Sequence, residues 1–362
     1  MIPGPTECHE AVLNIMSQPT VSHLDPTAFA PIFGEVIKMM RKVVVTETAQ
    51  PFIVSGSCSL GWDMLINLLE KGNDVLIINT GYFGDQVAKW FNFVRTGVRA
   101  DLKRISEVVK SISPDALIAV DGVCSVGVEE MQFDKWHLDV VITGTQKGLS
   151  APPGLCVVVV SQHALNVSKH RKTPVPLYYA NWNHWRPSKY STFISCGSSF
   201  VKMTMQNTTV MEAYEAGHVK YFATPSVPLI FALYESLKLA TKLPMETRVG
   251  IHHQVAANFR KEINAMGLKL MVRREEYAAN SVTTVWLPPD ISAEQLVSRM
   301  AKRGILIGPG VHKDCATKYF RVGHMGISAV ETNRKHMTMV LNALRRSFTE
   351  LGFHVQQMKQ NL

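Results

Sequence analysis

Residues 140–160 read VVITGTQKGLSAPPGLCVVVV. Two apolar runs of strand length, Val140–Thr143 and Cys156–Val160, flank a turn that is rich in Gly and Pro and carries Lys147. A lysine just past the carboxyl end of a buried strand lies where open α/β sheets place their ligand crevice. Apolar neighbours lower the pKa of such an amine, and the neutral amine can attack an aldehyde to form a Schiff base. An isolated lysine is usually a surface residue, so the neighbouring elements decide whether Lys147 is a surface lysine or a Schiff-base lysine.

Short β-branched runs alternate with helical stretches on both sides of this segment, which predicts an α/β fold with a doubly wound, mostly parallel sheet. Expected strands precede it at Phe52–Val54, Asp74–Asn79 and Ala116–Val120, and expected helices lie at Leu60–Glu70, Gly84–Phe93, Leu102–Ser111 and Pro228–Thr241. Beyond about residue 240 the pattern predicts helices at Ile251–Met266, Ala293–Arg303 and Thr332–Leu351 and strands at Ser281–Leu287, Ile305–Ile307 and Tyr319–Val322. We therefore expect an N-terminal arm (1–20), a large domain (21–240) and a smaller C-terminal α/β domain (241–362).

Two places break this alternation. Between Asn79 and Ala116, two helical stretches follow each other with no strand between them, whereas doubly wound folds return to the sheet after each helix. Residues 188–209 are rich in Ser and Thr and lack periodicity, which predicts an atypically long loop inserted in the large domain.

Composition excludes several classes of protein. The formal net charge is +9, but the basic residues are scattered and form no stripe interleaved with aromatics, so we expect no nucleic-acid partner. The apolar runs are too short to span a bilayer, so we expect no membrane association. The six cysteines form no CxxC pair, which predicts neither a metal site nor a disulfide scaffold and favours an intracellular location. No signal peptide is expected, and peroxisome, mitochondrion and cytoplasm all stay open.

Lys147 does have chemically suitable neighbours. Asp121 ends the expected strand at Ala116–Val120, at the same edge of the sheet, where a carboxylate can hold the pyridinium nitrogen of pyridoxal phosphate protonated. The loop Ser55-Gly56-Ser57-Cys58-Ser59 joins another strand to a helix and offers free N–H groups for a phosphate. Alone, Asp121 could be a helix N-cap and the loop an ordinary junction. Together, in the order phosphate loop, Asp, Lys, they indicate a cofactor site.

These elements resemble the class V aminotransferases of fold type I, in particular the group that acts on alanine and glyoxylate or on serine and pyruvate. The resemblance covers most of residues 2–187 and 210–350. The matching segments are Pro3-Gly4-Pro5, Phe52–Ser57, Val120–Ser125, Gln146-Lys147, Ala151–Gly154, Tyr214–Gly217, Tyr221–Pro225 and Arg321–Gly326. It implies pyridoxal phosphate as the cofactor and a small amino acid and a small 2-oxo acid as the substrates.

The resemblance also implies a role for each matching residue. Lys147 is the Schiff-base lysine and moves the proton, and Asp121 pairs with the pyridine nitrogen. Phe83 stacks on the cofactor ring, and the phosphate is held by Ser57, Cys58, Ser59 and Gln146. Tyr221 and Thr224 reach the phosphate of the neighbouring subunit, which implies a homodimer. Arg321 binds the substrate carboxylate in bidentate fashion, and Gly4 lies in the substrate site.

The sequence departs from the family in four places. Cys58 stands where the family has Gly, and Val94 stands where it has a hydroxyl that contacts the cofactor. The segment between Gly84 and Asp121 is shorter by roughly forty residues, which removes one strand–helix return, and residues 188–209 have no counterpart. Two alternatives to an active aminotransferase therefore stay open. One is a lyase of the cysteine desulfurase type with Cys315 as nucleophile, and the other is a catalytically impaired chain.

Overall fold

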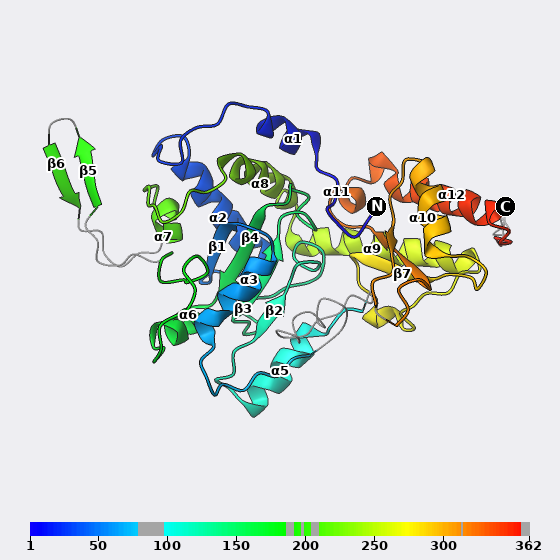
Figure 1. Cartoon of the computed structure of the whole chain (residues 1–362), viewed down its shortest axis with the longest axis horizontal. Helices are drawn as coiled ribbons and strands as arrows, with labels where there is room; N and C mark the ends of the chain where they lie inside the picture. Colours follow the sequence, from blue (N-terminus) through cyan, green and yellow to red (C-terminus); the bar gives the residue numbers. More distant parts are fainter. Residues whose placement is uncertain (79–97, 186–191, 197–198, 204–209, 313, 356–362) are drawn as a thin grey trace.

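A four-stranded sheet lies at the centre of the larger part of the molecule (Figure 1). The computed structural model describes residues 1–78, 98–185, 192–196, 199–203, 210–312 and 314–355. The strand order is β1-β4-β3-β2, with bounds Gln50–Ser55, Leu155–Val160, Val140–Gly144 and Ala119–Asp121. β2 pairs parallel with β3, whereas β4 pairs antiparallel with both β1 and β3. Three strands thus share one direction, and β4 runs against them.

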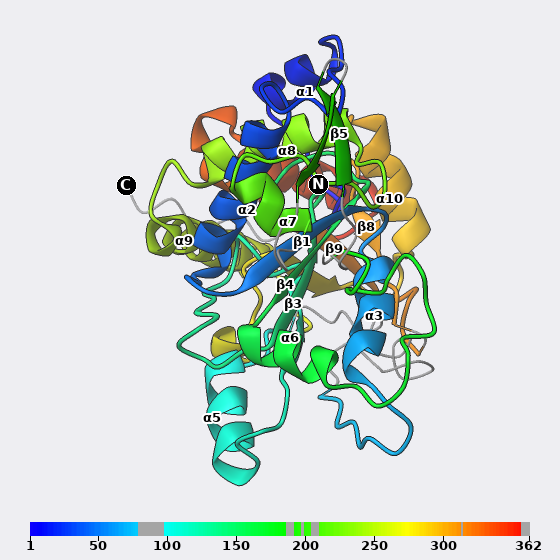
Figure 2. The ribbon, with the colours of Figure 1, turned by 90° about the vertical axis from the view of Figure 1, so that its left-hand side faces the viewer.

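Helices cover both faces of this sheet. Figure 2 shows the sheet between α2 (Ala30–Val44) on one side and α3 (Ser59–Met64) on the other. In α2, buried apolar residues recur at helical spacing and form the face that packs toward the sheet: Phe33, Val36, Ile37 and Met40. The remaining helical elements of this part are α1 (Glu10–Met16), η1 (Leu65–Leu68), α5 (Leu102–Ile112), α6 (Gln162–Lys169), α7 (Val210–Glu215) and α8 (Val227–Ala240). β3 and β4 are buried along their whole length because both of their faces are covered.

A second, smaller sheet has its own apolar core. Its antiparallel order is β7-β9-β8, with bounds Val282–Trp286, Tyr319–Gly323 and Gly308–Pro309. The helices of this part are α9 (Met245–Ala265), α10 (Ala293–Lys302), α11 (Ile327–Val330) and α12 (His336–Glu350), with short 3-10 turns at Glu275–Tyr277 and Thr332–Arg334. Its core includes Phe259, Phe320, Leu344 and Phe348. In the described part of the chain, no helix has both the length and the apolarity that a membrane span requires.

Most of the expected elements are present, with five corrections in the described residues. The expected helix over 60–70 is α3 followed by the 3-10 turn η1, which ends at Leu68, and the strand expected from Ala116 begins only at Ala119. Residues 74–78 form no strand, and Leu76 is 85% exposed, because no described strand lies beside them to complete a ladder. Residues 305–307 are irregular, and the short strand β8 begins only at Gly308. The expected helix over 332–351 is interrupted at Lys335, whose φ of 55° is left-handed. The expected helix at 84–93 lies outside the described residues.

The insertion at 188–209 contains a β-hairpin where the sequence predicts a loop. β5 (Thr192–Cys196) pairs antiparallel with β6 (Ser199–Met203) and forms a separate two-stranded sheet. Phe, Ile and Val in these runs favour strands, and this preference outweighs the Ser and Thr content. Figure 1 shows the hairpin standing away from the rest of the molecule, and it adds no strand to the central sheet.

Candidate active site

Lys147 is buried under the N-terminal arm. It lies on the loop between β3 and β4, is 7% exposed, and donates from Nζ to the carbonyl oxygen of Pro3 at 2.5 Å. Gly4 has a φ of +99°, and a Cβ at this position would lie 2.5 Å from Nζ, so only glycine allows the arm to pass so close to the lysine. Thr6 fixes the arm, because its hydroxyl donates to the Lys147 carbonyl oxygen at 2.8 Å and its N–H to the Gln146 carbonyl oxygen at 2.9 Å.

Asp121 ends β2, the strand next to β3. Because β2 and β3 are parallel, with Asp121 opposite Ile142, the aspartate and Lys147 leave the sheet at the same edge. One carboxylate oxygen of Asp121 accepts from the N–H of Val123 at 2.9 Å, which fixes the side chain at the end of the strand. The structure therefore places Lys147 and Asp121 at one edge of the sheet, as the sequence predicts.

The loop from Ser57 to Ser59 joins β1 to α3. Ser57 and Ser59 are exposed, while Cys58 is half-buried and its Sγ accepts from the Gln146 side-chain amide at 3.3 Å. A Cβ on Gly144 would lie 2.0 Å from this Sγ, so the thiol sits directly over the end of β3. Burial raises the pKa of the Cys58 thiol, and the charge of Asp121 adds to the effect. Cys58 is therefore a neutral thiol in contact with Gln146.

Arg321 lies on β9 and shares a cavity with Asp121. The cavity has a volume of about 1030 Å³, and its described walls include Pro3, Asp121, Thr284 and Arg321. The Arg321 side chain donates from Nε to the Pro309 carbonyl oxygen at 2.8 Å. Lys147 meets this wall through Pro3, whose carbonyl oxygen accepts from the lysine. The cavity thus joins the sheet edge of the large part to the sheet of the small part.

Two of the predicted site residues that the structure describes, Tyr221 and Thr224, are not brought together with these groups. Tyr221 is 58% exposed, and its hydroxyl lies 3.2 Å from the hydroxyl of Thr224, which is also exposed. The Tyr221 ring packs against His23 with ring centroids 5.3 Å apart, away from the cavity wall. Phe83 lies outside the described residues, as does Val94.

Two buried residues of α9 support the site and were not found from the sequence. Arg248 donates from Nε to the Gly127 carbonyl oxygen at 2.9 Å and from Nη2 to the Gly148 carbonyl oxygen at 2.7 Å. It thereby ties the loop after Asp121 to the residue after Lys147. Burial lowers its pKa to about 10, so it stays cationic at neutral pH. His252, one turn further on, accepts from the N–H of Gly326 at 3.2 Å. A single sequence gives no signal for these contacts, because Arg and His in a helix are usually exposed.

Comparison with known proteins identifies the family. A model described as "Aminotransferase class-V" matches residues 90–174. The alanine–glyoxylate aminotransferase 1 of Saccharomyces cerevisiae is 31% identical over 392 aligned positions, which cover 93% of this chain and 94% of the yeast protein. The chain belongs to the class-V aminotransferases. A serine–glyoxylate aminotransferase of Arabidopsis thaliana is 25% identical, with 90% of this chain and 84% of that protein covered.

Solved structures confirm the predicted α/β fold of this class-V aminotransferase. The alanine–glyoxylate aminotransferase of Nostoc sp. has a TM-score of 0.80 at 24% identity, with 96% of this chain and 94% of that chain covered. The ureidoglycine–glyoxylate aminotransferase of Bacillus subtilis also has a TM-score of 0.80 at 24% identity, with 99% and 95% covered. At this level of identity the likeness shows the fold type I architecture alone.

Membership of the class-V aminotransferases implies pyridoxal phosphate, and the residues present fit this group. They supply a buried amine at Lys147, a carboxylate at Asp121 on the adjacent strand, and hydroxyl and amide groups at the β1–α3 loop and Gln146. The lack of a side chain at Gly4 leaves the space in which Nζ lies. Cys58 fits less well. Its thiol accepts a hydrogen bond from the side-chain amide of Gln146 and lies over Gly144, where the phosphate would bind.

Proposed function

We propose that the chain catalyses pyridoxal-phosphate-dependent transamination between a small amino acid, alanine or serine, and a small 2-oxo acid, glyoxylate or pyruvate. The observation that carries this proposal is the buried Lys147 at the edge of the sheet where Asp121 ends the adjacent parallel strand. The names of the yeast and Arabidopsis relatives, an alanine–glyoxylate and a serine–glyoxylate aminotransferase, support these substrates.

Lys147 and Asp121 are the catalytic residues in this proposal. When bound, pyridoxal phosphate supplies a ring that withdraws electrons from the Cα atom of the amino acid. The carboxylate of Asp121 holds the ring nitrogen in its protonated form by an ion pair. The Nζ atom of Lys147 would hold the cofactor, and the same amine would serve as the base that takes the proton from Cα and, as the conjugate acid, gives it back. Burial of the lysine keeps water away from this proton transfer.

Two further groups of residues bind the phosphate and the substrate. Ser57, Cys58, Ser59 and Gln146 hold the phosphate from within the chain, and Phe83 stacks on the ring. The surface position of Tyr221 and Thr224 suits a contribution to the phosphate site of a second copy, and this implies a homodimer. Arg321, on the wall that also holds Asp121 and Pro3, binds the substrate carboxylate through two parallel N–H groups, and Gly4, which follows Pro3 in the arm, lies in the substrate site.

A lyase of the cysteine desulfurase type is the second candidate, and the site favours it less. Its nucleophile would be Cys315, which is half-buried in the turn before β9. Burial raises the pKa of this thiol, and the neighbouring Asp314 raises it further. A nucleophilic cysteine needs the opposite environment, because the thiolate is the reactive form.

The proposed function is tested on the purified full-length chain. Pyridoxal phosphate is added, the complex is reduced with borohydride, and tryptic peptides are mapped for a pyridoxyl group. Label on Lys147, together with formation of glycine from alanine or serine and glyoxylate, supports the proposal. Label on another lysine overturns the assignment of the catalytic residue. Sulfide release from cysteine in place of amino transfer identifies a lyase instead.

A further inference from the structure

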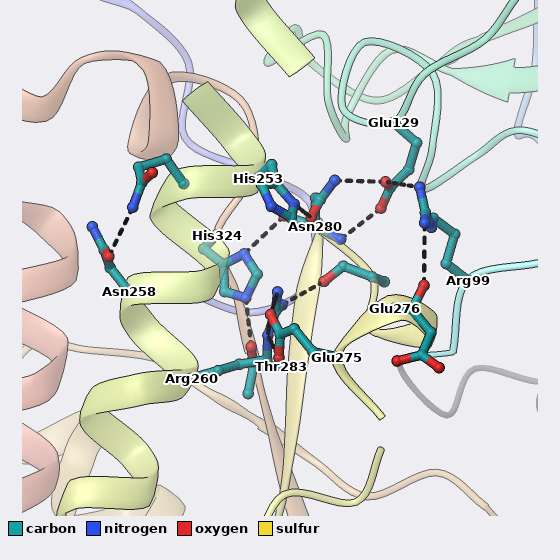
Figure 3. Close-up of polar contacts among 12 residues, drawn as sticks. Arg99, Glu129, His253, Asn258, Arg260, Glu275, Glu276, Asn280, Thr283 and His324 are labelled. Atoms are coloured by element: carbon teal, nitrogen blue, oxygen red, sulfur yellow. Dashed lines mark hydrogen bonds and ion pairs between the residues drawn. The ribbon is translucent and has the colours of Figure 1, made fainter. Parts of the chain in front are cut away.

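A buried carboxylate, Glu129, joins the large part of the molecule to the small part. Glu129 lies on the loop between Asp121 and β3, and Asn280 lies just before β7. One oxygen of Glu129 accepts from the backbone N–H of Asn280 at 2.6 Å, and the other accepts from the side-chain amide of Asn280 at 2.8 Å (Figure 3). The two residues are 7% and 4% exposed. Two such hydrogen bonds to one carboxyl group hold the asparagine in one orientation.

Asn280 is in turn connected to the small sheet. Its carbonyl oxygen accepts from Nδ1 of His324 at 2.9 Å, and Nε2 of His324 accepts from the Thr283 hydroxyl at 2.8 Å. His324 directly follows β9 and is fully buried, and Figure 3 shows it between Asn280 and Thr283. Any displacement of Asn280 is therefore transmitted to the end of β9. Arg321 lies on this strand, three residues before His324.

The contact also lies on the wall of the cavity described above. Glu129 and Asp121 line it from the large part, and Ser281 and Arg321 line it from the small part. Arg99 extends the connection, since its guanidinium lies 4.0 Å from Glu129 and donates to the Glu276 carbonyl oxygen at 3.1 Å. The loop that follows Asp121 and the strand that carries Arg321 are thus joined next to the space between them.

We propose that Glu129 and Asn280 are positioning residues, whose paired hydrogen bonds fix the separation of Asp121 and Arg321 and thereby set the affinity for the substrate carboxylate. This inference rests on the proposed function, because Arg321 receives its carboxylate-binding role there. A buried carboxylate is costly unless its oxygens accept hydrogen bonds. Both oxygens of Glu129 accept from Asn280, a residue of the small part. A purely apolar contact would not fix the orientation of the two sheets in this way.

The test exchanges the partners of this contact. Asn280→Asp places a second carboxyl group against Glu129. Glu129→Gln alone is a conservative change, because the Asn280 amide, which otherwise faces the exposed His253 on its other side, can turn over and accept from the new N–H donor. In the double variant Glu129→Gln/Asn280→Asp the side-chain donor and acceptor are exchanged, and both hydrogen bonds can form again. Asn258→Asp is the matched control, since this exposed asparagine of α9 accepts from the Gln254 side-chain amide on the same helix and lies apart from Glu129 (Figure 3).

Two measurements distinguish positioning from general destabilisation. By amide hydrogen exchange, Asn280→Asp should raise exchange in β9 about tenfold and leave β1 and β4 unchanged. In steady-state kinetics, KM for both the amino acid and the oxo acid should rise about tenfold, with kcat changed by less than about twofold. The double variant should restore both quantities, and Asn258→Asp should alter neither.

Four results decide between this inference and the function on which it rests. Unchanged exchange in β9 of Asn280→Asp overturns the inference, as does an equal rise in β1 and β4 that the double variant does not reverse. Local exchange that the double variant restores, with no change of KM in an active enzyme, also overturns it. Absence of transamination by the unaltered chain, with exchange that still follows the variants as expected, supports the contact between the sheets and overturns the proposed function.

Discussion

The Nζ atom of Lys147 lies 2.5 Å from the carbonyl oxygen of Pro3, a residue 144 positions earlier in the chain. The N-terminal arm therefore closes over the amine, and Thr6 holds the arm in place through hydrogen bonds to the same loop. Nζ is also the atom that a cofactor would engage, so the Pro3 carbonyl oxygen and a cofactor compete for the same amine. The conformation of the arm and the loading of the lysine are consequently linked.

Replacement of Lys147 by alanine should abolish covalent attachment of pyridoxal phosphate. After borohydride reduction, the unaltered chain should carry the pyridoxyl group on Lys147, and Lys147→Ala should carry none. Mass spectrometry of the tryptic peptides measures this directly. Equilibrium dialysis should still detect weak, noncovalent cofactor in the variant, because the phosphate-binding residues are intact. A labelled peptide that does not contain residue 147 would disprove the assignment.

Replacement of Arg321 by lysine should weaken binding of both substrates in any active form of the enzyme. Lysine keeps the charge but loses the planar pair of N–H donors. Loss of one charge-assisted bidentate contact costs roughly 1.5–3 kcal/mol, so KM should rise about tenfold to a hundredfold for the amino acid and the oxo acid alike. Steady-state kinetics with each substrate varied in turn measures this effect. The same KM for both substrates in variant and parent would refute the role.

Replacement of Cys58 by glycine should tighten the binding of pyridoxal phosphate. The thiol covers Gly144 and occupies the side-chain amide of Gln146, so its removal frees both for the phosphate. A gain of about 1 kcal/mol corresponds to a roughly fivefold lower Kd. Titration of the apoprotein by cofactor absorbance gives this value, and Cys315→Gly serves as the control. Equal or weaker binding by Cys58→Gly would show that the thiol does not crowd the phosphate.

The free energy of unfolding should fall as the pH falls below about 6.5. Burial lowers the pKa of His252 to about 3 and that of His324 to about 4, from an ordinary value of 6.5. Between these values the unfolded chain binds protons that the folded chain does not, so acid favours unfolding by about 1.4 kcal/mol per pH unit for each histidine. Urea unfolding at several pH values measures the slope. His324→Gln should flatten it, and an unaltered slope would contradict the prediction.

The chain as it stands should bind cofactor weakly and have low solubility. The described sheet ends at β2. Residues 74–78 pair with no strand among the described residues, and Leu76 is 85% exposed. The alignment with the yeast relative spans 392 positions, more than the 362 residues present, so that relative contains residues with no counterpart here. Each buried backbone group left unpaired costs roughly 1–3 kcal/mol against a net stability of about 5–15 kcal/mol.

Two altered chains test this account of the sheet. Deletion of residues 188–209 should improve solubility and cofactor binding only slightly, because the β5–β6 hairpin pairs with itself. Insertion of a segment from a relative before Thr96 should improve both far more, because it restores a strand–helix return. Size-exclusion chromatography and cofactor absorbance give the comparison. Full cofactor loading and high solubility of the unmodified chain, with no gain from the inserted segment, would contradict the prediction.

The sequence predicted those elements whose signals are local. Val140–Thr143 and Cys156–Val160 are strands because continuous β-branched residues suit a sheet buried on both faces. The same reasoning failed at residues 74–78, where a strand-like run has no described partner, since pairing is a property of two segments. The antiparallel direction of β4 was missed because a single run of valines does not encode its orientation.

In the candidate site, too, the residues with a local signal were predictable and the long-range contacts were not. Lys147 and Asp121 follow strands, so the rule for crevices at strand ends places them together. The contacts that support them were not predictable, because Arg248, Glu129 and Asn280 are ordinary polar residues in the sequence. These residues are buried because the large and small parts of the molecule contact each other there. The contacts join residues more than a hundred positions apart in the chain.

The position of β4 in the sheet has a consequence for synthesis on the ribosome. β1 and β3 both pair with β4, and the partners in the β1–β4 ladder are 100 to 110 residues apart in the chain. At a translation rate of about 5–20 residues per second, β1 waits roughly 5–20 s for its neighbour. During this interval the apolar face of α2 has no sheet to pack against. A nascent chain of this length is therefore a natural client for a chaperone near the exit tunnel.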